Sequence, residues 1–168
     1  MRWMWIDRIL ELDRAKRCVA IKNVSLAEEV LHDHFPATAD QPACPVMPNP
    51  LIIEGMAQTA GILVGHANDF QEKVILAKIA KAEFHAAARP GDQLRFTATV
   101  SRIDPAGAAT EGVVERRAAG QSDFLPMAQI DLLFSHLDQS RSDLDLPEHN
   151  FVFSSNLMTL LQQSGIAE

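Results

Sequence analysis

Two ionisable residues of this sequence lie where ionisable residues are unusual. His34 lies in residues 32–50, a segment that contains five of the nine prolines of the chain. Glu54 lies in residues 51–67, a run that is otherwise almost entirely apolar. A buried carboxylate is unfavourable unless it is paired or protonated. Folding does not require this residue, so either Glu54 reaches solvent at the edge of its element or it has a chemical function.

The two residue types are suited to acid–base chemistry. A neutral imidazole is a good base near pH 7, so His34 is a candidate to remove a proton from carbon. A carboxyl group in an apolar wall tends to keep its proton at neutral pH, so Glu54 is a candidate to donate one. Together they could remove a proton from one carbon and expel a hydroxyl from the next. Considered alone, a histidine in a loop is more often solvated or structural.

Residues 51–67 predict a buried helix. Asn49 is a good N-cap, and Pro50 falls at the first helical position, where proline is tolerated. The run is apolar on nearly all sides, which is typical of an enclosed helix. Glu54 and Gln58 are four residues apart and therefore share a face. The glycines in this run make sense if another element, such as a sheet, packs very close to the helix.

The remaining pattern predicts strands around this helix. Apolar and polar residues alternate most clearly at 93–101 and 126–137, as in half-buried strands. The predicted strands are residues 3–13, 17–24, 73–86, 93–101, 108–118 and 126–137. Their order predicts an α+β fold in which an antiparallel sheet wraps around one long central helix. We expect one domain over residues 1–137, then a C-terminal extension over residues 138–168 with a polar linker and a short helix.

Charge and composition argue against several classes of protein. The 168 residues carry a formal net charge of −7, so no general basic surface for nucleic acid or anionic membrane is expected. Cys18 and Cys44 form no metal-ligand spacing and are expected to be reduced thiols in a cytoplasmic protein. Residues 51–67 are too short and too polar for a membrane span. The run His32–Asp33–His34 lacks a further set of ligands, so no metal is expected.

Three runs around His34 and Glu54 together resemble a known signature. They are His34–Phe35–Pro36, Pro45–Val46–Met47–Pro48 and Leu51–Ile52–Ile53–Glu54–Gly55–Met56–Ala57–Gln58. In this order they resemble HFPGxPVMPGxLIIEAxAQ, the signature of the bacterial 3-hydroxyacyl-acyl-carrier-protein dehydratases of FabZ type. Residues 7–12, 16–24 and 90–94 are similar to other parts of that family, so the resemblance spans residues 5–137. The glutamate at position 54 is typical of the FabZ type rather than of the isomerising FabA type.

The resemblance implies a hotdog fold that works as a homodimer, often as a trimer of dimers. It implies that His34 of one subunit meets Glu54 of the other in a tunnel at the interface. The implied reaction converts (3R)-hydroxyacyl chains on acyl carrier protein to trans-2-enoyl chains in fatty acid biosynthesis, with no metal or other cofactor. Acyl carrier protein is the implied partner, with no nucleic acid and no membrane.

The resemblance also implies roles for residues beside the catalytic pair. The N–H of Asn49 would stabilise the thioester oxygen as it gains negative charge. The carbonyl of Val46 would orient His34. Gln58 would either hydrogen-bond near Glu54 or simply satisfy a partner on the helix face. Asn49, Val46 and Gln58 are therefore the candidate oxyanion or substrate-binding residues.

Two departures from the family pattern lie beside the predicted site. Asn49 stands where the family has glycine; asparagine keeps the N–H and tolerates a positive φ better than most residues. The segment Ala37–Cys44 is several residues longer than the motif, and it could reshape the entrance of the tunnel next to His34. Two alternatives therefore remain. One is a hotdog thioesterase, which would use a carboxylate on the helix and not require His34. The other is a non-catalytic acyl-binding protein.

Overall fold

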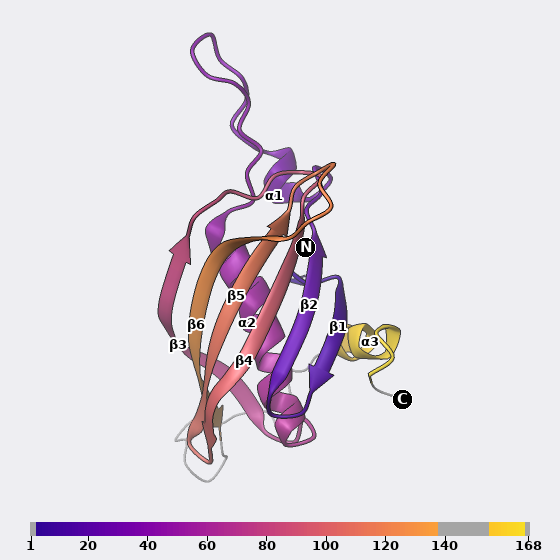
Figure 1. The fold of residues 1–168 in the computed structure, drawn as a ribbon, viewed down its shortest axis with the longest axis vertical. Helices are drawn as coiled ribbons and strands as arrows, with labels where there is room; N and C mark the ends of the chain where they lie inside the picture. Colours follow the sequence, from indigo (N-terminus) through magenta and orange to yellow (C-terminus); the bar gives the residue numbers. More distant parts are fainter. Residues whose placement is uncertain (1–2, 138–154, 167–168) are drawn as a thin grey trace.

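The computed structural model describes residues 3–137 and 155–166, which form one sheet and three helices (Figure 1). The strands are β1 Arg8–Asp13, β2 Arg17–Asn23, β3 Lys73–Phe84, β4 Gln93–Asp104, β5 Gly107–Arg117 and β6 Leu125–Leu137. The helices are α1 Glu29–His32, α2 Asn49–Ala67 and α3 Ser155–Gln163.

The sheet is antiparallel throughout, with strand order β1-β2-β4-β5-β6-β3. In Figure 1 its strands cross in front of α2, which packs against five of them. The predicted α+β class, with an antiparallel sheet around one long helix, is confirmed. The first strand begins at Arg8 rather than at residue 3, because residues 3–6 pack on α2 instead. The backbone N–H of Trp5 donates to the Gln58 side chain at 2.9 Å.

Helix α2 is buried on the side that faces the sheet, whereas its remaining residues are half-buried or exposed, so it is less enclosed than its apolar sequence predicts. Ile52, Met56 and Leu63 are among its fully buried side chains. At Gly55 a Cβ atom would lie 2.7 Å from the Phe96 ring of β4 and 3.0 Å from the backbone oxygen of Trp5, so the sheet and the N-terminal segment approach too closely there for any side chain. None of the helices described is both long enough and apolar enough to span a membrane.

The start of α2 differs from the prediction by one residue. Asn49 is the first helical residue, and Pro48 is the N-cap, with extended backbone angles of φ −60° and ψ 134°. Proline favours this position because its φ is already fixed near that value. Its carbonyl accepts hydrogen bonds from the N–H groups of Leu51 and Ile52. The positive φ that asparagine would tolerate at residue 49 does not occur, because residue 49 is helical and is not among the described residues with positive φ.

Helix α3 docks against β1, which lies at one edge of the sheet (Figure 1). Leu157, Leu160 and Leu161 are buried in the core. The Ile9 N–H in β1 donates to the Ser164 hydroxyl at 3.1 Å, so the end of the helix satisfies a backbone donor of this edge strand. The predicted linker from residue 138 lies outside the described residues, and the predicted domain boundary there stays a prediction.

The docking of α3 makes a stability prediction. Replacing Leu161 with alanine removes a fully buried side chain, and such substitutions destabilise proteins by about 2–5 kcal/mol. The matched control is Met158→Ala on the exposed side of the same helix, where a surface change stays within about 0.5 kcal/mol. Urea unfolding of both variants measures the difference. Equal unfolding midpoints for the two variants would contradict the docked position of α3.

Candidate active site

His34 is held by the short helix that precedes it. Its Nδ1 atom lies 2.8 Å from the carbonyl oxygen of Leu31, the third residue of α1. A carbonyl oxygen only accepts hydrogen bonds, so Nδ1 carries the hydrogen and a neutral ring leaves Nε2 unprotonated. The Leu31 side chain is fully buried, and the imidazole of His34 is half-buried. The acceptor is Leu31 and not Val46, so the expected role of the Val46 carbonyl is not seen in this chain.

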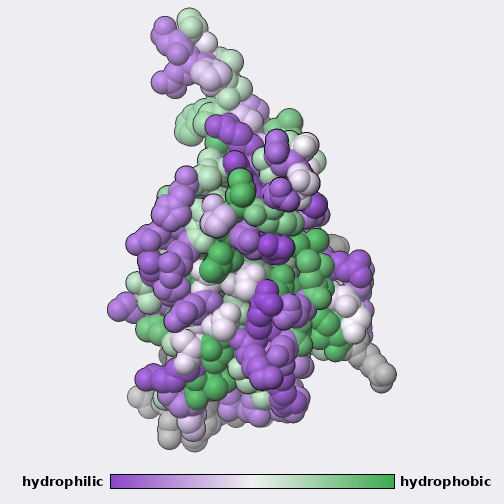
Figure 2. Space-filling model, viewed as in Figure 1, coloured by the Kyte–Doolittle hydropathy of each residue, from purple (hydrophilic) through white to green (hydrophobic). Residues whose placement is uncertain are grey.

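Residues 35–46 form an extended arm directly after His34. Phe35 and Cys44 pair across it as an isolated antiparallel bridge. The arm projects beyond the body of the molecule (Figures 1 and 2), and Phe35 is 82% exposed. The additional segment Ala37–Cys44 makes up most of this arm, so it extends away from the protein instead of filling the space around His34.

Both ends of the arm are anchored in the core. Leu31 lies before it, and Met47, which follows it, is fully buried. The Met47 N–H donates to the carbonyl of Ala88 at 2.9 Å, which ties the returning chain to the segment before β4. Val46 is half-buried at the base of the arm. The longer segment therefore leaves the backbone on either side of it fixed.

Glu54 lies between the first and second turns of α2 and is half-buried. Its Oε1 atom accepts a hydrogen bond from Gln58 Nε2 at 3.0 Å. The Gln58 amide is itself held by the N-terminal segment. Its oxygen accepts from the backbone N–H of Trp5, and its nitrogen also donates to the backbone carbonyl of Trp3 at 3.1 Å. Gln58 therefore bonds both to Glu54 and to a partner beside the helix. Because Oε1 is the acceptor, a proton on this carboxyl group belongs on Oε2.

Asn49 provides a backbone donor at the start of α2. The first N–H groups of a helix have no partner within the helix, and Asn49 is exposed. Among the hydrogen bonds of the described residues, none uses the Asn49 N–H. A donor at a helix N-terminus can stabilise negative charge that develops on an oxygen atom nearby.

The structure assembles the predicted site as two separate parts. Glu54 and Gln58 are joined directly, whereas His34 is joined to α1. No hydrogen bond or ion pair of the described chain links His34 with Glu54. Across residues 3–137 and 155–166, no three potential metal ligands lie together.

Sequence reasoning missed the groups that position the two parts. The Leu31 carbonyl and the backbone of the two tryptophans are main-chain atoms, and main-chain atoms are the same for every residue type. The nearest available signal is the pattern of an apolar residue three positions before His34, which is too common to be informative.

The two thiols have opposite environments. Cys18 is buried in β2, and this burial, with a smaller contribution from the negative charge of Glu11, raises the pKa of its thiol to about 12. Cys44 is exposed at the base of the arm. The thiolate is the reactive form of cysteine, so the two residues differ in reactivity.

We therefore expect one fast-reacting thiol per native chain. Titration with Ellman's reagent near pH 8 should modify Cys44 rapidly and Cys18 only on unfolding. The Cys44→Ser variant should lose the fast phase, and Cys18→Ser should keep it. Two fast thiols in the native protein would contradict the buried position of Cys18.

Similarity to known proteins is found at the level of sequence. Residues 2–120 match the family of the FabA-like domain. The 3-hydroxyacyl-[acyl-carrier-protein] dehydratase FabZ of Caldanaerobacter subterraneus subsp. tengcongensis is 38% identical over 114 residues, which cover 67% of this chain and 77% of that protein. The protein of the same name from Symbiobacterium thermophilum is 42% identical over 95 residues, covering 56% and 63%.

Similarity to solved structures concerns the fold. The dehydratase heterocomplex ApeI:P from Xenorhabdus doucetiae aligns with a TM-score of 0.58 at 17% identity, covering 82% of this chain and 86% of that one. An acyl-CoA hydrolase from Staphylococcus aureus gives the same TM-score and identity, covering 75% and 68%. Proteins named for different reactions thus share this arrangement of sheet and helix, which is the hotdog fold.

Proposed function

Since the chain belongs to the FabA-like family, we propose that it is a dehydratase that removes water from 3-hydroxyacyl chains on acyl carrier protein in fatty acid biosynthesis. The names of its FabZ relatives support this reaction class. The observation that carries the proposal is the hydrogen bond of His34 Nδ1 to Leu31, because it leaves Nε2 of a neutral ring as a base. The thioesterase alternative, with a carboxylate on the helix that activates water, would not require this histidine.

In the proposed reaction His34 and Glu54 act on adjacent carbons of the substrate. His34 Nε2 removes a proton from C2, the carbon next to the thioester carbonyl. Glu54 donates the proton on Oε2 to the C3 hydroxyl, which leaves as water as the C2–C3 double bond forms. The product is the trans-2-enoyl thioester, with a protonated imidazole and a carboxylate left in the site. Return of the proton from His34 to Glu54 restores the starting state.

The start of α2 would stabilise the transition state. Loss of the C2 proton places negative charge on the thioester oxygen, and a backbone N–H aimed at that oxygen lowers the barrier. The Asn49 N–H is the proposed donor. Because Asn49 is helical, its N–H has the fixed direction of the first turn of α2. Glycine at this position is therefore not needed for backbone conformation, which makes the replacement by asparagine compatible with the reaction.

We further propose that one site is built from two subunits of a homodimer, with His34 from one chain and Glu54 from the other. Within one described chain no hydrogen bond or ion pair joins the two residues, and each is positioned by a separate set of bonds. A symmetric dimer would bring each residue to its counterpart twice and give two equivalent sites.

The two edges of the sheet support this assembly. The β1 edge is partly covered, because α3 packs against β1 and the Ser164 hydroxyl accepts from the Ile9 N–H. The β3 edge pairs only with β6 among the described strands, and its side chains are mostly exposed over the length of the strand. Leu76 and Ile79 are apolar members of this exposed set. A long uncovered edge strand with exposed apolar residues is a template for pairing with a second chain.

Substitution of the catalytic pair gives the main test of the proposed reaction. We expect His34→Ala and Glu54→Gln each to lower kcat for dehydration of a 3-hydroxyacyl thioester by about 10²- to 10⁴-fold, the usual contribution of a general base or acid. The measurement is steady-state kinetics with 3-hydroxybutyryl and longer chains on acyl carrier protein.

Two controls accompany this assay. His32→Ala and Glu111→Gln change exposed residues of the same types and should leave kcat unchanged. A saturated acyl thioester tests the thioesterase alternative, and we expect no release of the carrier thiol. Full dehydratase activity in His34→Ala, or rapid hydrolysis of the saturated thioester, would overturn the proposal.

The proposed dimer makes a second prediction. Ile79→Asp would bury two carboxylates at the paired β3 edges, so it should convert a dimer into a monomer with no dehydratase activity. Ile103→Asp, at a similarly exposed position on β4, is the matched control and should remain dimeric and active. Sedimentation equilibrium measures the mass. A wild-type monomer with full activity would refute a site shared between subunits.

A further inference from the structure

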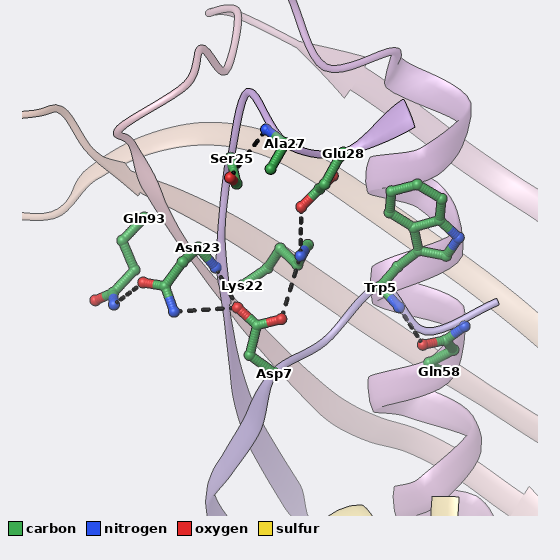
Figure 3. Close-up of polar contacts among 9 residues, drawn as sticks. All are labelled: Trp5, Asp7, Lys22, Asn23, Ser25, Ala27, Glu28, Gln58 and Gln93. Carbon is green, nitrogen blue, oxygen red and sulfur yellow. Dashed lines mark hydrogen bonds and ion pairs between the residues drawn. The ribbon is translucent and has the colours of Figure 1, made fainter. Parts of the chain in front are cut away.

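Lys22 is a buried lysine that the proposed reaction does not use. Its side chain is 9% exposed and lies between two carboxylates (Figure 3). Nζ is 2.6 Å from Glu28 Oε1 and 3.2 Å from Asp7 Oδ1. Lysine is among the residues least often buried, so this position calls for a physical explanation.

The lysine is charged in this environment. Burial lowers the pKa of Lys22, but the close contacts with the carboxylates of Glu28 and Asp7 raise it by more, so the net pKa is raised. The result is a buried ion pair between Lys22 in β2 and Glu28, which directly precedes α1. Removing one member of such a pair leaves the other charge uncompensated.

The Lys22 end of this pair is rigid. Asp7 Oδ2 accepts hydrogen bonds from the backbone N–H of Asn23 at 2.6 Å and from its side chain at 3.0 Å. The Asn23 side chain in turn accepts from Gln93 in β4 at 2.7 Å. Figure 3 shows these contacts as one continuous chain that ends at Glu28. Glu28 is thus attached to the sheet through its carboxylate.

The Glu28 backbone connects this attachment to α1. Its carbonyl accepts hydrogen bonds from the N–H groups of Leu31 and His32, both at 2.8 Å. Helix α1 has only four residues, and a helix this short is not stable without tertiary contacts. The described contacts that join this segment to the rest of the protein include the buried Leu31 side chain, the half-buried Val30 side chain packed on the core, and the ion pair of the N-cap residue Glu28.

From these contacts we infer that Lys22 and Glu28 are positioning residues for His34. The ion pair holds the start of α1 on the sheet, the one-turn helix fixes the Leu31 carbonyl, and that carbonyl fixes the ring orientation and the Nδ1–H tautomer of His34. This inference rests on the proposed role of His34 as the base. Loss of the pair would free the Leu31 carbonyl, and the base would be misplaced while substrate binding is kept.

The test compares Glu28→Gln and Lys22→Met with a matched control. Glu115→Gln removes a carboxylate of similar exposure, 21% against 19%, from its 2.7 Å ion pair with Arg95 in the sheet. All variants are first checked for folding by circular dichroism and thermal unfolding. Kinetics then separate kcat from KM. Nitrogen-15 NMR of the imidazole, assigned with His34→Ala, reports the tautomer without any need for activity.

We expect Glu28→Gln and Lys22→Met to lower kcat by about 10- to 100-fold with little change in KM, the effect typical of a misplaced catalytic group. The His34 signals should lose the pattern of a single Nδ1–H tautomer. The double variant should be no worse than either single variant, because the two residues act as one unit. Glu115→Gln should keep kcat and the tautomer at a similar loss of thermal stability.

Unchanged kcat and unchanged His34 signals in Glu28→Gln would overturn the inference, and so would an equal loss of kcat in Glu115→Gln. Failure of the proposed function gives a different result. If His34→Ala stays fully active, His34 is not the base, while the NMR comparison still decides whether the ion pair holds its ring. If Glu28→Gln does not fold, Lys22→Met decides the outcome by the same two measurements.

Discussion

The packing of α2 against the sheet is the constraint from which the rest of this structure follows. A helix that a sheet packs against must be apolar over the side that the sheet covers, and close contact at Gly55 leaves no room for a side chain. A carboxyl group on such a helix is held in place by few partners. The hydrogen-bond partner of Glu54 is Gln58. The N-terminal segment before β1 hydrogen-bonds to the Gln58 amide and does not pair as a strand. The position of Glu54 is therefore set by the same packing that builds the core.

The histidine is positioned by different means. It follows a one-turn helix that has little stability of its own, and its ring is oriented by a main-chain carbonyl. The long arm after it extends outward and is fixed at its base by buried Met47. One half of the proposed site thus belongs to the core, and the other half belongs to a segment tied onto the edge of the fold. Such a division suits a site that is completed when two chains meet.

Much of this was predictable from sequence, for a physical reason. Helix α2 and the strands follow from hydrophobic periodicity, which is a local property, and the motif around His34 and Glu54 identifies the family. The features that the sequence did not predict depend on tertiary contacts or on main-chain atoms. Helix α1 is attached to the sheet by the ion pair of Glu28 with a lysine on β2, a tertiary contact, and the α2 boundary moves to Pro48 because of its fixed φ. The role of the Leu31 carbonyl cannot be recognised from sequence, because every residue has a main-chain carbonyl.

The sharing of one site between two chains is most directly tested by a mixed dimer. His34→Ala and Glu54→Gln chains, carrying different affinity tags and co-expressed, are purified as the heterodimer. If the base comes from one chain and the acid from the other, one of the two sites keeps both groups, and about half of the wild-type activity returns. If both groups act within one chain, every site of the mixed dimer lacks one of them. A folded mixed dimer that is as inactive as its parents would contradict the account.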